Sequence, residues 1–316
     1  MDATQRLRYL RVPAVIMDGF MAKASFSLRV LIGVALTCLG IQVFAVEVAD
    51  DRGQTVTLDT PAHRVVALAP HLTEILFHIG SGDRLVGVMD HSDFPTAAQH
   101  LPRVGNHSRL DIEAILALKP DLIVGWESGN PPGDIALLET LGLPVFVSES
   151  RTLADIASLM SRLGMLVGKP EFAGQQADDF TQGSEELAVS YASRSRLRVF
   201  YQVWDEPLYT LNRDHIISGL IADCGGVNIF ADTAALSPAV SLESVIARDP
   251  EVIVGGSSDN TIPGWVERWQ NWPSVTAVRL GQVHVINADH IGRMGPRLLE
   301  GMRALCHAID QARSAV

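Results

Sequence analysis

The sequence predicts an α/β protein of two lobes, each with a central and mainly parallel sheet flanked by helices, joined by one long linking helix. Three observations carry this prediction. Short apolar strands alternate with helical segments in both halves of the chain, a pattern typical of parallel sheets covered on both faces. A strand-free stretch of helical character separates the two halves. A helix–turn–strand segment of the first half recurs in the second.

The first half opens with a hairpin and then enters the alternation. Residues 46–58 read as two short strands around a polar Asp-Asp-Arg-Gly turn. The segment Arg-Val-Val-Ala-Leu at 64–68 is almost entirely apolar, as expected of a strand buried on both faces. Pro70 ends this strand, and we expect a helix that begins at Thr73 and stops at Gly80.

The same alternation continues to residue 147. We expect strands at 85–88, 122–124 and 145–147, separated by helices at 112–118 and 135–141. Strands this short and apolar, each followed by a helix, favour parallel pairing in one sheet.

The linking helix divides the chain into its expected domains. From about residue 152 to residue 193 the chain is almost wholly helical in character, and Pro170 suits a first helical position. A second round of strands and helices then begins. We therefore expect an N-terminal lobe at 46–168, a linking helix at 169–196 and a C-terminal lobe at 197–316.

An internal repeat supports two homologous lobes. Residues 112–125 match residues 242–255, and both segments read as a helix, a turn of proline and an acid, and a buried strand that ends in glycine. Any helix-to-strand unit of an α/β fold shares this general pattern. Glu113 and Glu243, however, stand in register near the start of the two helices, which favours a true repeat.

The N-terminus has the character of a secretory signal within residues 1–45. Two basic residues precede an apolar run at 30–41, and Ala45 ends a small-residue cleavage motif. The run is too short to span a bilayer. Residues 1–20 lack such character, which is consistent with translation from Met21. We expect export to the periplasm.

The cysteines fit an oxidising compartment. Lipid anchoring through Cys38 requires a small residue before it, whereas Thr37 stands there. Removal of the signal leaves Cys224 and Cys306. An even count in an exported protein suggests a disulfide, and two buried free thiols are the alternative.

Composition and motifs narrow the function classes. The net charge of −11 argues against nucleic-acid binding, which requires a basic surface. The sequence has no Gly-x-Ser-x-Gly elbow, no phosphate-binding P-loop and no His-Glu-x-x-His zinc motif. We therefore expect a protein that is not an enzyme and holds no cofactor. The competing hypothesis is a secreted α/β enzyme with an unrecognised motif.

Several motifs together resemble one known family. They are the hairpin and first strand, the Ser-Asp-Phe-Pro segment at 92–95, the Cys-Gly-Gly segment at 224–226 and the Gly-Pro-Arg segment at 295–297. In this order and spacing they resemble the helical-linker (class III) periplasmic binding proteins of ABC importers, which take up siderophores, haem and cobalamin. The resemblance is greatest to the cobalamin-binding members and covers about residue 60 to the end.

The resemblance implies a transport role. It implies that a corrinoid ligand binds in a cleft between the lobes, and that the chain is a monomer when free. It places a disulfide at Cys224 and Cys306. It also places Glu113 and Glu243 at the positions that dock each lobe onto arginines of an ABC permease dimer, whose ATPase subunits drive import. One carboxylate on each lobe suits a two-fold symmetric partner.

The resemblance assigns the ligand contacts unevenly. Trp126 matches a tryptophan that packs on the corrin, Tyr209 stands where the family has phenylalanine, and Asp289 and Arg293 match polar residues near the ligand amides. Large flat side chains suit a corrin ring. These four residues are expected to bind the ligand.

Four histidines depart from the family pattern. They are His71, His91, His107 and His290, and we expect them to face the cleft as well. Imidazoles can serve as flat surfaces and hydrogen-bond donors to a corrin. They are also the commonest side-chain ligands of transition metals, so the second hypothesis is a haem, metal-siderophore or metal site on these histidines.

Overall fold

The computed structural model describes residues 45–258 and 262–315. The expected signal at 1–45 lies outside the described residues except for Ala45, and so do the alternative start at Met21 and Cys38. Within the described ranges, no helix combines the length and apolar character that a membrane crossing requires.

The N-terminal lobe is built on a four-stranded sheet in the order β4-β3-β7-β8, in which all neighbouring strands are parallel. Its strands are β3 (Val65–Ala67), β4 (Leu85–Val88), β7 (Leu122–Trp126) and β8 (Val145–Ser148). The connecting helices are α2 (Pro70–His78), α3 (Ile112–Ala117) and α4 (Pro132–Thr140), with 3-10 turns η1 (Gly82–Arg84) and η2 (Thr96–His100). Two antiparallel hairpins complete the lobe: β1 (Val46–Ala49) with β2 (Thr55–Leu58), and β5 (Gly105–Asn106) with β6 (Arg109–Leu110).

Helix α2 begins earlier than the sequence suggested. Pro70 was expected to end the strand and leave Thr73 to open the helix, yet Pro70 is the first residue of α2. Proline is well suited to this position because it has no N–H to leave unpaired and its φ already matches a helix. The early start brings His71 into the first turn, directly after the carboxyl end of β3.

The C-terminal lobe repeats the same sheet. The order β12-β9-β13-β14 is again parallel throughout. In both sheets the second strand in chain order lies at one edge, followed across the sheet by the first, third and fourth. The strands are β9 (Leu197–Gln202), β12 (Gly226–Asn228), β13 (Val252–Ser257) and β14 (Val283–Asn287), with a hairpin of β10 (Trp204–Asp205) and β11 (Leu208–Tyr209). The helices are α7 (Ile216–Asp223), α8 (Leu242–Arg248), α9 (Gly264–Trp269), α10 (Thr276–Arg279), α11 (Ala288–Gly292) and α12 (Leu298–Arg313).

The repeat extends to single hydrogen bonds. In the N-terminal lobe, the backbone N–H of Arg64 donates to Asp121 at 2.8 Å, and its Nε donates to the carbonyl of Lys119 at 3.1 Å. In the C-terminal lobe, the backbone N–H of Arg198 donates to Glu251 at 2.8 Å, and its Nε donates to the carbonyl of Asp249 at 2.8 Å. In both lobes an arginine near the start of the first sheet strand therefore holds the turn that contains the proline.

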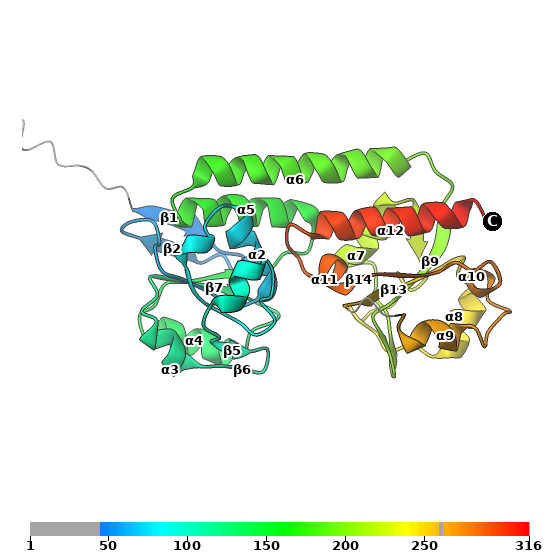
Figure 1. The fold of residues 1–316 in the computed structure, drawn as a ribbon, viewed down its shortest axis with the longest axis horizontal. Coiled ribbons are helices and arrows are strands. Elements are labelled where there is room, and N and C mark those ends of the chain that lie inside the picture. Colours follow the sequence, from blue (N-terminus) through cyan, green and yellow to red (C-terminus); the bar gives the residue numbers. More distant parts are fainter. Residues whose placement is uncertain (1–44, 259–261, 316) are drawn as a thin grey trace, which may run out of the picture. The chain divides into compact units, whose positions relative to one another are not determined.

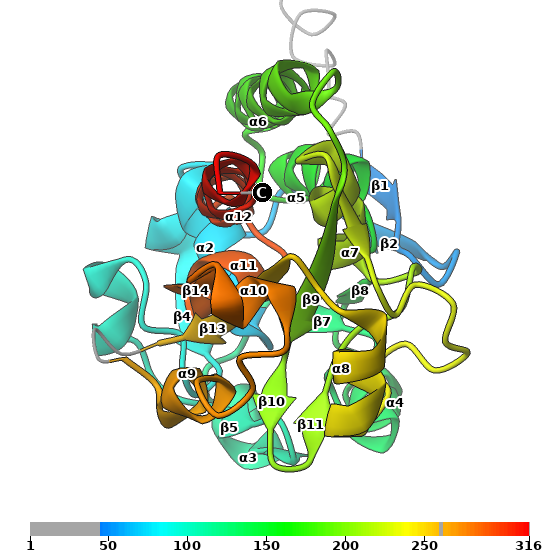
Figure 2. The same ribbon diagram turned by 90° about the vertical axis from the view of Figure 1, so that its right-hand side faces the viewer.

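Helix α6 (Pro170–Tyr191) connects the two sheets in sequence and lies against helices of both lobes (Figure 1). It packs on α5 (Leu153–Leu166) and on α12, as Figure 2 also shows from the side. A buried apolar cluster runs from the N-terminal sheet past these helices to the C-terminal sheet. Separate clusters cover the opposite face of each sheet. Alternating residues of β3 and β9 contribute to both faces, as strands buried on two sides require.

The predicted disulfide is confirmed. Cys224 caps the end of α7 and is bonded to Cys306 in α12, with Cα atoms 4.7 Å apart. Both cysteines are fully buried. The bond fastens α12 to the end of α7.

Candidate ligand-binding site

Most of the predicted ligand contacts lie where parallel strands end. His71 follows β3, His91 follows β4, and Trp126 is the last residue of β7. Asp289 and His290 follow β14 in the other lobe. Ligands of parallel α/β sheets bind at the carboxyl ends of the strands, where the loops can vary without disturbing the sheet.

The carboxyl edge of the N-terminal sheet faces the carboxyl edge of the C-terminal sheet. Asp93, in the loop after β4, lies 2.8 Å from Arg293, which follows the helix after β14. Because each residue belongs to the loop at the carboxyl end of its own sheet, the carboxyl edges of both sheets face a common region. The candidate site therefore lies between the lobes.

The C-terminal lobe contains a cavity of about 450 Å³ at the carboxyl ends of β9 and β13. Its lining includes the aromatic residues Tyr201, Trp204 and Trp265 and the polar residues Gln202 and His215. Apolar walls with a few convergent polar groups are typical of small-molecule sites.

Trp126 is held firmly on the N-terminal side. Its backbone N–H donates to the side-chain oxygen of Asn130 at 2.7 Å, while the Asn130 amide donates to the carbonyl of Leu68 at 2.8 Å. The His71 ring meets the Trp126 ring edge-on, with centroids 5.1 Å apart. Burial, together with the positive charge of Arg293, lowers the pKa of His71 to about 4, so its imidazole is neutral at neutral pH.

The hairpin β10–β11 presents an aromatic pair that the sequence analysis identified only in part. Tyr209 was expected at the site, and its cross-strand partner is Trp204. Directly opposite residues of an antiparallel pair project on the same face. Trp204 is 63% exposed, lines the cavity and donates its indole N–H to the carbonyl of Glu206 at 3.1 Å. A bulky aromatic residue just beyond a buried strand was the signal that could have identified it.

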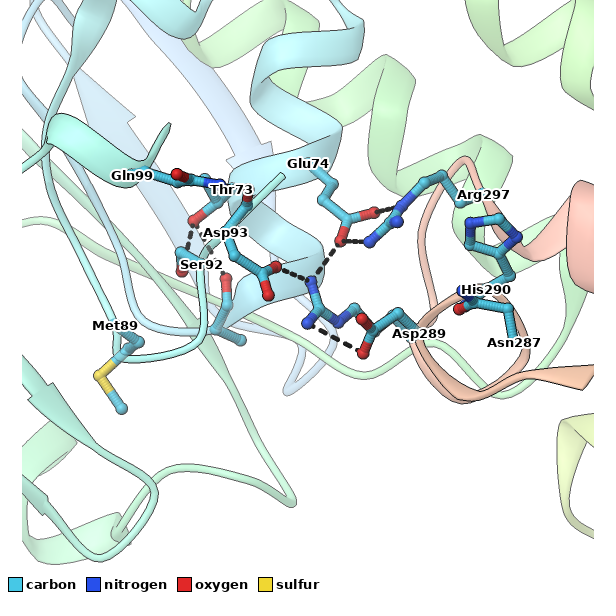
Figure 3. Close-up of polar contacts among 12 residues, drawn as sticks. Thr73, Glu74, Met89, Ser92, Asp93, Gln99, Asn287, Asp289, His290 and Arg297 are labelled. Carbon is cyan, nitrogen blue, oxygen red and sulfur yellow. Dashed lines mark hydrogen bonds and ion pairs between the residues drawn. The ribbon is translucent and has the colours of Figure 1, made fainter. Parts of the chain in front are cut away.

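Arg293 and Asp289 were predicted as ligand contacts, and the structure pairs them with each other at 3.0 Å. Arg293 also binds Glu74 of the other lobe at 2.8 Å, and Arg297 binds the same carboxylate (Figure 3). Hydrogen bonds to Asp93 and Glu74 raise the pKa of Arg293 despite the opposing effect of burial. Sequence reasoning missed Glu74 as part of the site, although a charged residue on the apolar face of a predicted helix was a signal.

The four histidines have different surroundings. His91 and His107 are exposed, His71 is buried against Trp126, and His290 lies 3.4 Å from Glu300. Within residues 45–258 and 262–315, no group of three or more His, Cys, Asp or Glu side chains is arranged to hold a metal ion.

The two predicted docking glutamates occupy matching positions. Glu113 and Glu243 are each the second residue of their helix, α3 and α8, and both are exposed. The N-cap side chains Asp111 and Ser241 accept a hydrogen bond from the third helical residue in each case. Hydrogen bonds from its own backbone N–H and from Ser241 lower the pKa of Glu243, which keeps it ionised.

Comparison with known proteins identifies the family. The periplasmic binding protein family matches residues 65–290, which include both sheets and α6. The chain belongs to this family. The predicted fold class and family are thereby confirmed.

Its relatives are binding proteins. The chain is 41% identical over 247 residues to the vitamin B12-binding protein of Vibrio cholerae, covering 78% of this chain and 88% of that protein. It is 36% identical over 245 residues to that of Yersinia pestis, covering 78% and 85%. The crystal structure of periplasmic vitamin B12-binding protein BtuF of Vibrio cholerae matches with a TM-score of 0.74 and 39% identity, covering 80% of this chain and 98% of that one.

Proposed function

We propose that this chain captures cobalamin or a related corrinoid between its lobes and delivers it to an ABC importer. The observation that carries the proposal is the 41% identity to a vitamin B12-binding protein across 88% of that protein's length. The periplasmic binding protein fold accounts for the architecture, because its two lobes present their strand ends to one ligand.

The chemistry of the site suits a large flat ligand. Trp126 on one lobe and the Trp204–Tyr209 pair on the other provide aromatic faces, whose burial against a corrin ring favours binding. The polar groups of Gln202 and Asp289 lie nearby to orient amide side chains of the ligand. His71, neutral at neutral pH, adds a flat surface without the cost of burying a charge.

Titration of the purified protein with cyanocobalamin tests the proposal. We expect binding at a stoichiometry of one that a metal chelator leaves unchanged, with the ligand recovered chemically intact as a carrier requires. Replacement of Trp126 by alanine should weaken binding about tenfold. Binding of haem or a divalent metal alone, lost when His71, His91, His107 and His290 are all replaced, would instead favour the metal-centred hypothesis.

We propose further that Glu113 and Glu243 dock the lobes onto a two-fold symmetric permease, which is coupled to its ATPase subunits. Their matched positions on α3 and α8 present one exposed carboxylate per lobe to a basic partner. Exposed ion pairs of this kind set register and encounter rate more than affinity. The chain acts as a monomer in the periplasm, exported by its N-terminal signal.

Charge reversal separates docking from ligand binding. The double variant Glu113→Lys, Glu243→Lys should abolish cobalamin uptake by cells that depend on this protein, while its affinity for cyanocobalamin stays within about twofold of wild type. The matched control reverses two exposed glutamates of α6, Glu171→Lys and Glu185→Lys, with the same change in net charge. Uptake that survives in the first variant, or is lost equally in the control, would refute the docking role.

A further inference from the structure

A cluster of five charged side chains joins the two lobes. We call it the inter-lobe joint; its members are Glu74 and Asp93 of the N-terminal lobe and Asp289, Arg293 and Arg297 of the C-terminal lobe. Glu74 pairs with both arginines of the cluster (Figure 3). Its carboxylate accepts from Arg293 Nη1 at 2.8 Å and from Arg297 Nε and Nη2 at 2.8 Å and 2.6 Å.

The central carboxylate is buried. The side chain of Glu74 is 1% exposed, and those of Arg293 and Arg297 are each 13% exposed. A charge this deeply buried depends on its partners, because without them it keeps the cost of leaving water. Every cationic partner that this structure gives Glu74 comes from the opposite lobe, so the lobes cannot separate here without exposing or unpairing it.

The N-terminal half of the joint is itself fixed. The hydroxyl of Thr73, next to Glu74 on α2, donates to Ser92 at 3.2 Å. Arg103 donates to the carbonyls of Met89 and Ser92, both at 3.0 Å. These contacts hold the loop that carries Asp93. The carboxylates of Glu74 and Asp93 are therefore held in place by contacts within their own lobe.

The joint borders the candidate site on both sides. Glu74 lies one helical turn beyond His71, which packs on Trp126. Arg293 lies between Gly292 and Met294, both of which line the cavity of the C-terminal lobe. A shift of the joint would change the distance between the walls that are proposed to hold the ligand.

We propose that Glu74 is a positioning residue for ligand binding, which acts through Arg293 and Arg297 to set the separation of the two lobes. The inference rests on the proposed function and deepens it. Each Nη of Arg293 already binds a carboxylate. Arg293 therefore acts mainly by joining the lobes and not by binding the ligand. The same joint sets the spacing of Glu113 and Glu243, the distance that a permease dimer would recognise.

Distance measurements between the lobes test this directly. Spin labels at Ala117→Cys and Ala247→Cys, exposed residues of α3 and α8, report the separation by double electron–electron resonance in the signal-free protein, whose two native cysteines, Cys224 and Cys306, are bonded to each other. Glu74→Gln keeps the shape of the side chain and removes its charge. We expect a broader or displaced distance distribution and cyanocobalamin binding weaker by at least about tenfold, with faster dissociation.

A matched control distinguishes positioning from general destabilisation. Asp50 is 5% exposed and pairs with Arg52 inside the N-terminal lobe, so Asp50→Asn breaks a buried ion pair that does not join the lobes. It should leave the distance distribution and the affinity unchanged. An unaltered distribution in Glu74→Gln, or an equal change in Asp50→Asn, would overturn the proposal. If wild type did not bind cyanocobalamin at all, the proposed ligand would fail, while the distance distribution would still decide the role of Glu74.

Discussion

At the scale of single residues, the aromatic surface on the N-terminal side depends on a glycine. Gly129 lies against the Trp126 ring, and a Cβ at this position would overlap Cε3 of the indole. The ring therefore keeps its place because residue 129 has no side chain.

We predict that Gly129→Ala displaces the Trp126 indole and weakens cyanocobalamin binding about tenfold, because a flat contact is lost while the fold persists. Isothermal titration calorimetry measures the change. Gly133, in α4, is the matched control, since a Cβ there meets nothing within 4 Å. Equal affinities of Gly129→Ala and Gly133→Ala would exclude Trp126 from the ligand site.

His71 makes stability depend on pH. Its pKa is about 4 in the folded protein, whereas an unfolded chain protonates histidine below a pH of about 6.5. The unfolded state therefore binds more protons as the pH falls from about 6.5 to 4, and stability decreases over that range. We predict that wild type loses about 2 kcal/mol more unfolding free energy than His71→Gln between about pH 7 and 4.5. Urea titrations of both proteins measure this difference, and parallel pH profiles would contradict it.

At the scale of elements, both lobes share a strained turn between a helix and a strand. Lys119 has a φ of 49° and Asp249 a φ of 41°, at equivalent places before the proline of each repeat. A left-handed residue with a side chain costs about 1 kcal/mol. Asp249 offsets that cost by accepting hydrogen bonds from the Thr276 N–H at 2.8 Å and hydroxyl at 2.9 Å, whereas Lys119 is exposed.

The same substitution should therefore act oppositely in the two lobes. Lys119→Gly is expected to stabilise the protein by about 0.5 kcal/mol, since relief of strain slightly exceeds the added entropy of the unfolded chain. Asp249→Gly should destabilise it by about 1 kcal/mol or more, because it removes two hydrogen bonds. Thermal unfolding measures both effects, and changes of the same sign would contradict this account.

At the scale of the whole molecule, a covalent and an ionic link act at two places along α12. The disulfide fastens α12 to α7, and the inter-lobe joint at the start of α12 connects this lobe to α2. Helix α12 also packs on α6. The proposed joint is therefore connected through α12 to both α6 and α7.

We predict that the Cys224→Ala, Cys306→Ala variant loses about 4 kcal/mol of unfolding free energy, since the bond closes a loop with a sequence separation of 82. Urea denaturation of the oxidised wild type and the variant measures this loss. A variant as stable as wild type would show that the unfolded chain gains little freedom when the bond is removed.

The architecture and the internal repeat could be predicted from the sequence, and the resemblance to a family added the disulfide. These features leave local traces: strands buried on two faces are apolar runs, Pro170 starts a helix, and Glu113 and Glu243 share a register within matching segments. Such signals depend on neighbouring residues, so the order of the chain is enough to reveal them.

Which side chains meet could be known only once the packing of the two lobes was seen. Glu74 and Arg297 are separated by 223 positions in sequence, and no local sequence pattern predicts that they pair. Arg293 likewise proved to be shared among three carboxylates, and the four histidines proved to have separate environments. Local preferences decide whether a segment forms a helix or a strand. Contacts between distant elements depend instead on how the two sheets and their helices pack. That packing is driven by the burial of apolar surface over the whole chain.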